Sequence, residues 1–360
     1  MQATAQDTAH ASSSAQFNNG NTRPNRTYVG RINLASGGGP GTPLRIPPAF
    51  LGDVLDLECY LSPSFTQVAS ETTAPAFNDV TGPWSFMPTF NLQVAGVDDP
   101  VQGVSGFDLY LFELMKTRSF STTGTSQLPP KNTTTSPVTT TENWFVPIEV
   151  PIAYSYSWPR AMLPLGNQQL VAMLNPTFNA ATSILTLNTG STVNWGADSY
   201  VDVYLRSFSV PANPQALPSS VGREIHQLLY LPTPLTSSGK VLVNVPTGQG
   251  IRYLRMAQYV VNDGVIDTSN GMGLSTLQLI RQTNDIQQTW TYNGIREDNA
   301  KDYLQPLPGG AWCFDLTTAF PRDVIDASAL SYLQVQLNFT GSQPTQPAEV
   351  HTVLEALLTQ

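Results

Sequence analysis

The chain has 360 residues, which is too long for one small β-sandwich and suits one large domain or two medium ones. Apolar residues make up 41% of it and charged residues only 12%; the first value excludes wholesale disorder, and the second is about half the usual share. The net charge of −9 argues against a large nucleic-acid surface, which must be basic. No stretch approaches the ~18 uninterrupted apolar residues of a membrane span.

The first 26 residues are mostly Ala, Ser, Gln, Asn and Thr, with little to bury. They predict a flexible N-terminal arm that orders only against something else. They contain neither the basic region nor the apolar core of a signal peptide. Ser36–Gly41 is rich in glycine and predicts a flexible elbow, since it lacks the Lys-Ser/Thr ending of a phosphate-binding loop.

Apolar and polar residues then alternate strictly in several segments. This period of two is typical of half-buried antiparallel strands. The apolar sides are Leu55/Leu57/Cys59/Leu61, Phe90/Leu92/Val94, Val201/Val203/Leu205, Val241/Val243/Val245 and Leu333/Val335/Leu337/Phe339. Helical candidates are few and short, at 297–305, 323–330 and 352–359. The predicted class is all-β.

Two biased stretches interrupt these strands. Ser119–Thr141 is Thr-rich and polar, which predicts a long exposed loop. Val210–Ser220 has three prolines in eight positions and predicts a stiff linker between two domains.

The chain also repeats one arrangement. Trp144–Tyr154 is an apolar strand that runs into a proline corner, followed by a short irregular piece and a second strand that ends at Phe178. Trp312–Pro321, an irregular piece and a strand that ends at Phe339 follow the same order. The spacings are similar, so we predict two copies of one β-sandwich in tandem.

Few residues are candidates for catalysis, disulfide formation or metal binding. Cys59 and Cys313 lie in apolar contexts and are interpreted as buried reduced thiols, with a disulfide or metal site as the alternative. His226 has no nucleophile elbow beside it, which favours a hydrogen-bonded histidine at a strand start over a catalytic base.

The acidic pairs are equally weak candidates. Asp98-Asp99 and Asp263…Asp267 lack the spacing of an EF-hand and are interpreted as turn carboxylates. A carboxylate pair for glycoside hydrolysis need only meet in space, so that chemistry stays open. We predict no catalytic, cofactor-binding or metal-binding residue, no cofactor, and no enzyme activity.

In its order of motifs the chain resembles the double jelly-roll major capsid proteins of tailless icosahedral bacteriophages with an internal membrane, the tectivirus-like group. The resemblance covers roughly residues 27–345. It is carried by Val146–Tyr154, Asn175–Phe178, Phe107–Leu111, Arg223–Gln227, Val245–Leu254, Phe314–Leu316 and Phe320–Val324.

The resemblance implies two eight-stranded jelly rolls, at 27–212 and 213–345, between the arm at 1–26 and a C-terminal tail at 346–360. It also implies a homotrimer of pseudo-hexagonal outline that tiles an icosahedral virion shell over an internal membrane, assembled in the host cytoplasm. Neighbouring capsomers, minor capsid proteins and vertex proteins would be its partners, the arm would contact the membrane, and no direct nucleic-acid contact is expected.

Two alternatives stay open beside this structural role. One is a carbohydrate- or receptor-binding β-sandwich protein of a phage, for which Trp158, Trp195 and Trp290 are the candidate aromatics. The other is a β-sandwich glycosidase.

Overall fold

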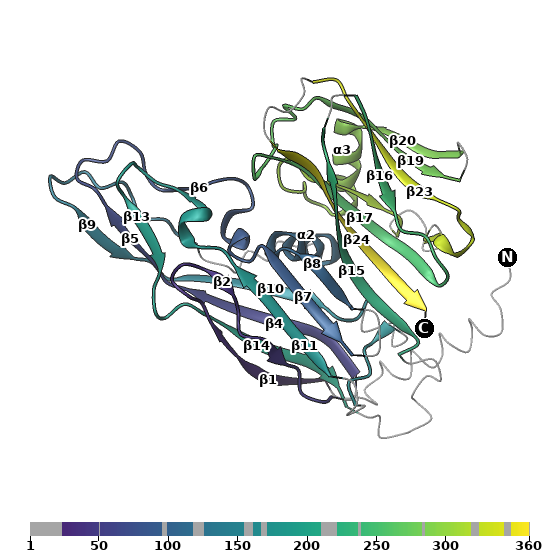
Figure 1. The fold of residues 1–360 in the computed structure, drawn as a ribbon, viewed down its shortest axis with the longest axis horizontal. Helices are drawn as coiled ribbons and strands as arrows, with labels where there is room; N and C mark the ends of the chain where they lie inside the picture. The colour runs from purple at the N-terminus through teal and green to yellow at the C-terminus, as the bar shows by residue number, and fades with distance from the viewer. Residues whose placement is uncertain are drawn as a thin grey trace.

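Strands dominate the computed structural model, and they form two units in tandem, the first roll and the second roll (Figure 1). The structure describes residues 24–49, 51–95, 99–117, 126–154, 161–166, 171–209, 222–236, 239–282, 285–317, 324–341 and 347–359. The predicted linker at 210–220 lies outside these residues, as do positions 1–23 of the predicted arm.

The first roll consists of two antiparallel sheets that share one core. One sheet has the order β1-β14-β4-β10, and the other runs from β2 and β3 through β11 and β7 to β8. The bounds are β1 Pro24–Asn33, β2 Gly39–Pro40, β3 Leu44–Arg45, β4 Leu51–Leu61, β7 Thr89–Val94, β8 Val101–Val104, β10 Trp144–Pro151, β11 Ala172–Phe178 and β14 Tyr200–Phe208. The alternating apolar residues of β4, β7 and β14 face this core, as predicted.

The second roll repeats the plan with the sheets β15-β24-β17-β21 and β16-β23-β19-β20. Its strands are β15 Glu224–Pro234, β16 Gly239–Val245, β17 Ile251–Asn262, β19 Leu274–Arg281, β20 Asp285–Thr291, β21 Trp312–Asp315, β23 Leu333–Phe339 and β24 Ala348–Thr359. Two short strands, β18 Val265–Ile266 and β22 Ile325–Asp326, each pair antiparallel with β17. The alternating residues of β16 and β23 form the second core.

Both rolls have the same topology. If the strands of the two main sheets of each roll are counted in chain order, with β2 and β3 as one position and the short strands β18 and β22 left out, each roll has one sheet of order 1-8-3-6 and one of order 2-7-4-5. Trp144 and Trp312 each open the sixth strand, and Phe178 and Phe339 each end the seventh. The repeat predicted from the sequence is therefore confirmed, strand by strand.

One helix precedes the sixth strand of each roll. α2 (Gly106–Thr117) lies between the two rolls and α3 (Tyr292–Asp302) belongs to the second roll (Figure 1). The candidate at 297–305 overlaps α3. No helix was expected from the sequence at the position of α2.

The rolls are joined through β8 and β15, which pair in parallel at Val101↔Leu228 and Gln102↔Leu229. This pairing merges the second sheet of the first roll with the first sheet of the second roll. Leu228, Tyr259 and Val353 of the second roll belong to the core cluster of the first. The two rolls therefore share buried apolar surface.

Small sheets extend the first roll away from this junction (Figure 1). They pair β5 (Pro63–Gln67) with β9 (Val138–Thr141) and β13 (Thr192–Trp195), and β6 (Ala76–Phe77) with β12 (Leu185–Thr186). Short 3-10 turns lie at Gly82–Phe86, Ala181–Ser183 and Ala327–Ala329. The end of the predicted loop Ser119–Thr141 is thus a strand, and Asn132 within it is buried.

Three other expectations are wrong. The segment 352–359, predicted as a helix within a C-terminal tail at 346–360, belongs to β24, which lies between β15 and β17 in the sheet. The arm cannot extend to residue 26, because β1 starts at Pro24. In the candidate helix 323–330, the described residues form β22 and a 3-10 turn.

The glycine elbow at Ser36–Gly41 is also built into the fold. Gly39 and Pro40 form β2, and the Gly41 amide donates to the Pro176 carbonyl. Gly38 has a φ of 73°, a conformation that favours glycine. A Cβ there would lie 2.5 Å from the Ala180 nitrogen, so this turn requires glycine.

Candidate functional site

The cysteines and the histidine singled out from the sequence have structural roles. Cys59 and Cys313 are both buried and free, as predicted. His226 is fully buried in β15 and lies 2.7 Å from Glu355 through Nε2, which confirms a hydrogen-bonded histidine. It has no exposed surface at which a substrate would meet it.

The acidic candidates among the described residues, Asp99, Asp263 and Asp267, lie in turns or connecting segments. Asp263 and Gly264 have φ values of 54° and 77° between paired Asn262 and Val265, as in a two-residue hairpin of type I′. Asp267 accepts backbone N–H groups from Gly271 and Met272. Asp99 accepts from the Val94 amide, and Asp98 lies outside the described residues. In the part of the chain that the structure describes, no group of three or more metal-ligating side chains comes together.

Two of the three tryptophans of the carbohydrate-binding alternative lie among the described residues, and these two form no exposed platform. Trp195 is buried and donates from Nε1 to the Asn179 carbonyl. Trp290 is half-buried and packs edge-on against Phe314. Trp158 lies outside the described residues.

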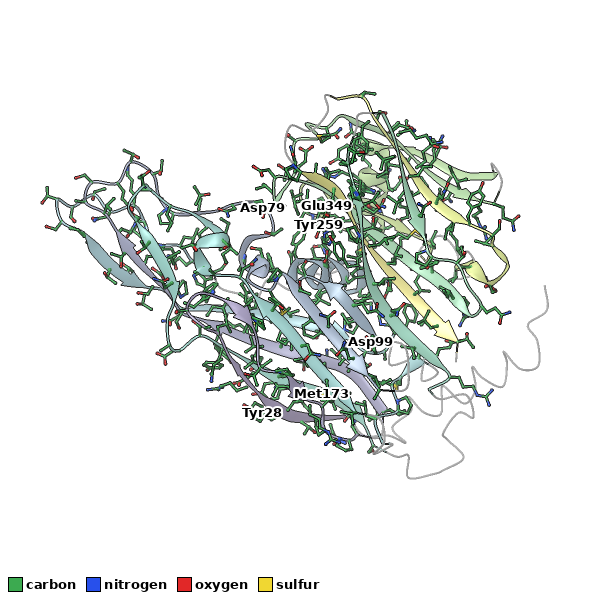
Figure 2. The ribbon with its side chains drawn as sticks, in the orientation of Figure 1. Tyr28, Asp79, Asp99, Met173, Tyr259 and Glu349 are labelled. Carbon is green, nitrogen blue, oxygen red and sulfur yellow. The ribbon has the colours of Figure 1, made fainter. Side chains whose placement is uncertain are left out.

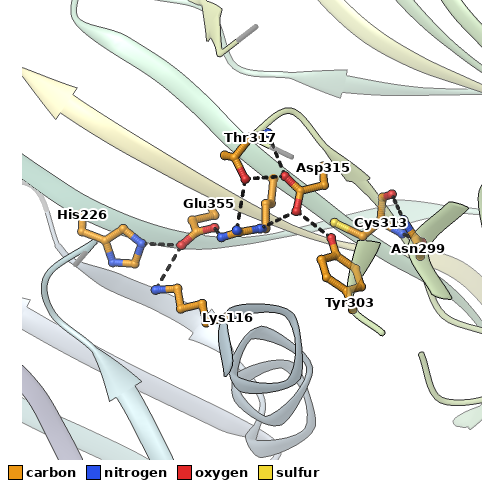
Figure 3. Close-up of polar contacts among 9 residues, drawn as sticks. Lys116, His226, Asn299, Tyr303, Cys313, Asp315, Thr317 and Glu355 are labelled. Carbon is orange, nitrogen blue, oxygen red and sulfur yellow. Dashed lines mark hydrogen bonds and ion pairs between the residues drawn. The ribbon is translucent and has the colours of Figure 1, made fainter. Parts of the chain in front are cut away.

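The most concentrated set of functional groups lies between the two rolls; we call it the charged seam (Figure 3). Its centre is Glu355 on β24, which is fully buried. Glu355 Oε1 lies 3.2 Å from Lys116 Nζ on α2 and 2.7 Å from His226 Nε2. Its Oε2 accepts from Arg255 Nη1 on β17 at 2.8 Å. The seam therefore ties the helix of the first roll to the central strand of the second.

The seam continues toward α3 through Asp315. Arg255 Nε donates to Asp315 Oδ2 at 2.9 Å, and the Tyr303 hydroxyl donates to the same oxygen at 2.8 Å. Two cations, Lys116 and Arg255, thus face two buried carboxylates, Glu355 and Asp315. Such an arrangement is tolerated because every charge is paired.

The pKa values follow from burial and pairing. Burial alone would raise the pKa of Glu355, but Lys116 and Arg255 hold it well below its usual range. Burial lowers the pKa of His226, and the Lys116 charge lowers it further. His226 is therefore a neutral donor to an ionised Glu355.

A second set, the histidine clasp, joins the same helix and strand. His351 on β24 stacks between the rings of Tyr230 and Tyr259, with centroids 4.2 and 4.3 Å away. Its Nε2 lies 3.0 Å from Asp108 Oδ2 on α2, and the Tyr259 hydroxyl donates to Asp108 Oδ1. Figure 2 shows Tyr259 and Glu349 in this region between the rolls.

Protonation strengthens the clasp. Burial would lower the pKa of His351, but Asp108 and Glu349 outweigh that effect and raise it to about 9. The pKa of Asp108 is lowered despite burial, because His351 faces it. At neutral pH an imidazolium and a carboxylate therefore hold the two rolls together.

The outward side of the sheet β1-β14-β4-β10, here the outer face, carries paired charges and aromatics. Arg31 donates twice to Asp202, at 2.7 Å each, and lies over the Tyr200 ring. Arg26 bridges Asp56 and Glu58. Tyr28 lies at the outer edge of this sheet and is 51% exposed (Figure 2).

A cavity of about 300 Å³ lies beside α3 on the second roll, against β20 and β21. Trp290, Lys301 and Asp302 are among its lining residues. Its polar groups belong mainly to the exposed side of α3.

Two rolls of identical 1-8-3-6 and 2-7-4-5 topology in one chain, with a helix before each sixth strand, define the double jelly-roll class. The class implied by the sequence resemblance is thus confirmed at the level of fold. Solved structures of this class are similar over nearly their whole length.

Three examples are structures of viral capsid proteins. The STIV MCP, from Sulfolobus turreted icosahedral virus, has a TM-score of 0.66 and 16% identity, covering 94% of this chain and 97% of that one. The major capsid protein P2 of bacteriophage PM2 has a TM-score of 0.57 and 9% identity, covering 94% and 98%. The PBCV-1 virus capsid protein has a TM-score of 0.59 and 10% identity, covering 93% and 94%. At these identities the shared property is the fold.

Comparison by sequence adds no relative. Neither the protein-family models nor the curated proteins include a match to this chain. Among the described residues, no helix has the length and apolar character needed to cross a membrane.

His226 could be singled out from the sequence, but its partner Glu355 and the other main members of the charged seam and the histidine clasp could not. Lys116, Arg255, Glu355 and His351 lie on three separate elements, and nothing in their spacing marks them as neighbours. The one available signal was the presence of charges inside apolar runs, as in Val353–Leu358, because a buried charge needs a partner.

Proposed function

We propose that this chain is a major capsid protein, a structural subunit without catalysis whose work is self-assembly. The observation that carries the proposal is the double jelly-roll fold, shared over more than nine-tenths of the chain with capsid proteins of three viruses. A fold alone does not set a function. Here the match extends to the entire two-roll arrangement rather than one common module.

The site chemistry supports a structural role. The charged seam is buried and its charges are paired within the chain, so its groups are occupied in holding the rolls at a fixed angle. Enzymes keep their reactive groups in open clefts. In a shell subunit, a fixed angle between the rolls is the property that lets identical copies tile.

The proposed assembly is a homotrimer of pseudo-hexagonal outline, since identical lateral contacts are satisfied in a closed ring. These capsomers would meet neighbouring capsomers, minor capsid proteins and vertex proteins in an icosahedral virion shell over an internal membrane. Assembly would take place in the host cytoplasm. We assign the N-terminal arm to the inner side of the shell, and the net charge of −9 disfavours direct contact with nucleic acid.

Electron microscopy of the purified protein tests the proposal, with pseudo-hexagonal trimers as the expected particles. Few charges are available for lateral contacts, so the trimers should persist at high salt. Sedimentation at micromolar concentration in low and high salt is the second measurement. Monomers in both conditions would contradict the proposal.

A further inference from the structure

The two sheets of the first roll differ in the charges on their solvent sides. The outer face carries on its two central strands the charged residues Asp56, Glu58, Asp202 and Arg206. The other sheet has β7 and β11 as its central strands. Their solvent-side residues, which alternate with core residues, are Thr89, Asn91, Gln93, Met173, Asn175 and Thr177. None of these side chains is charged.

The corresponding sheet of the second roll has the same property. Its central strands, β19 and β23, belong to the side of that roll that lies away from the first roll (Figure 1). Their solvent-side residues are Thr276, Gln278, Ile280, Gln334, Gln336 and Asn338. None of these is charged either. We call the solvent side of β7 and β11 the first amide face, and that of β19 and β23 the second amide face.

The strand registers show that the two amide faces match position by position. Asn175 and Gln336 each lie three residues before the phenylalanine that ends the seventh strand. Across the sheet they pair with Asn91 and Gln278. In the next outward-facing row, the equivalent pairs are Thr89–Thr177 and Thr276–Asn338. Both rolls therefore carry an amide pair beside a pair that contains threonine.

The amide groups of these faces can both donate and accept hydrogen bonds. Asn175 Nδ2 donates to Gln93 Oε1 at 3.1 Å in the first face, and Asn338 Nδ2 donates to Thr276 Oγ1 at 2.8 Å in the second. These bonds hold the side chains in place, while each amide keeps a further N–H group and lone pairs. A surface that both donates and accepts is complementary to a copy of itself, whereas a surface of one charge sign is not.

The net charge of the chain favours these faces for contact between assemblies. At −9 per chain, two oligomers carry charge of the same sign and repel each other. This repulsion acts over the Debye length, about 8 Å at physiological salt, so the charges at a contact matter most. The amide faces set no fixed charges against each other. Arg45 on β3 and Lys240 on β16 lie on the edge strands beside Met173 and Asn338, as charges do at the rim of an interface.

We propose that the amide faces are the surfaces through which a subunit of one capsomer contacts a second copy of this chain in the neighbouring capsomer. The inference rests on the proposed function, because it assigns the contact by which capsomers would tile a shell. Each roll presents one such face, so a trimer would present one for each side of a pseudo-hexagonal tile. Because either face is complementary to either, the same contact serves capsomers in different rotations.

A contact between amide faces has a predictable character. A neutral amide exchanges hydrogen bonds with water for hydrogen bonds with its partner, which leaves a small net gain per bond. Bridging waters can take part in such a contact. Without fixed charges at its centre, the contact also depends little on salt. The expected association between capsomers is therefore weak, reversible and insensitive to salt.

Like charges at the centre of both faces test the proposal. The double variant Asn91→Asp with Gln278→Glu keeps the side-chain shapes, and a carboxylate at position 91 can still accept the Gly103 amide. Trimers should persist in this variant. Association between trimers, measured by sedimentation at rising protein concentration, should weaken at least about tenfold at low salt, because like charges meet at the contact. High salt should restore the association by screening, which damage to the fold of the face would not allow.

The double variant Thr139→Glu with Thr192→Glu is the matched control. It adds the same charge to each chain at exposed positions of β9 and β13, away from both amide faces. The general repulsion between trimers is then the same in both double variants. The control should weaken association far less, since its charges do not meet at the contact.

Cross-linking locates the contact without added charge. Trimers that carry Asn175→Cys with Gln336→Cys are prepared separately in normal and isotopically heavy form, mixed at high concentration and treated with a short bis-maleimide. The natural Cys59 and Cys313 are buried, so they do not react. We expect covalent pairs of one normal and one heavy chain. Thr139→Cys with Thr192→Cys is the control and should give none.

The outcomes separate this contact from the capsid proposal. Asn91→Asp, Gln278→Glu trimers that associate like the parent, with no mixed pairs in the cross-linking experiment, would overturn the contact and leave the capsid proposal intact. Parent trimers that do not associate at any concentration would do the same. If the charged variant forms no trimers, the cross-link decides, and the absence of mixed pairs overturns the contact. A parent chain that stays monomeric would overturn both proposals.

Discussion

Glu355 offers the sharpest test of the charged seam. Replacing it by glutamine keeps the shape of the side chain but removes the charge that faces Lys116 and Arg255. Arg255 keeps its ion pair with Asp315, whereas the Lys116 ammonium has no second ion pair among the described residues. Breaking one side of a buried ion pair typically costs about 3–5 kcal/mol. We expect a loss of that size in the free energy of unfolding at neutral pH.

Urea unfolding followed by tryptophan fluorescence measures this loss, since Trp144 and Trp312 report on the cores of the two rolls. The double variant Lys116→Met with Glu355→Gln removes both charges and should recover part of the stability, because the orphaned ammonium is gone. Asp298→Asn, which breaks an exposed pair with Lys301, is the control and should cost less than about 1 kcal/mol. A Glu355→Gln protein that unfolds within about 1 kcal/mol of the parent would refute this account of the seam.

Further outcomes follow from other groups. The pKa of His351 is raised to about 9, so the contribution of the histidine clasp to the free energy of unfolding is complete below about pH 6.5 and is lost as the pH rises through 9. The free energy of unfolding of His351→Gln, measured against pH, should lack this decline. Burial raises the pKa of Asp53 to about 6, so the folded state disfavours the ionised carboxylate relative to the unfolded state. Asp53→Asn should therefore raise the thermal midpoint at pH 7, and a lower midpoint would contradict this reasoning. Gly38→Ala should destabilise the protein by more than about 1 kcal/mol, whereas Gly37→Ala, with open space around it, should not; equal midpoints would contradict the turn geometry. Deletion of residues 2–22 should leave trimers intact but reduce complete particles in an assembly assay, and a normal particle yield would argue against a role for the arm.

Several strands could be predicted from the sequence because only one face of their sheet is covered. In β4 and β23, one side meets a core and the other meets water, so apolar and polar residues alternate. The same contrast made the tandem repeat visible, because the tryptophan-led sixth strands have similar surroundings in both rolls.

Three of the failures, at β24, at α2 and at the charged seam, share one physical cause, the contact between the rolls. β24 is buried on both faces, so Val353–Leu358 shows no alternation and its Leu, Ala and Glu residues favour a helix. α2 lies between the rolls and is apolar around most of its circumference, which removes the polar stripe that normally reveals a helix. The charged seam could not be predicted for the same reason, since its members meet only when the rolls dock.

The position of β24 at the end of the second roll sets the order in which the two rolls can fold during synthesis. The described strands of the first roll end at Phe208, so that roll can form while the ribosome is still at work, as domains generally do. The second roll has a gap between β15 and β17 that only β24, synthesised after both, can fill. That strand also brings Glu355 and His351, the groups that fasten the rolls to each other. A nascent chain therefore lacks the rigid two-roll shape until translation has passed residue 359.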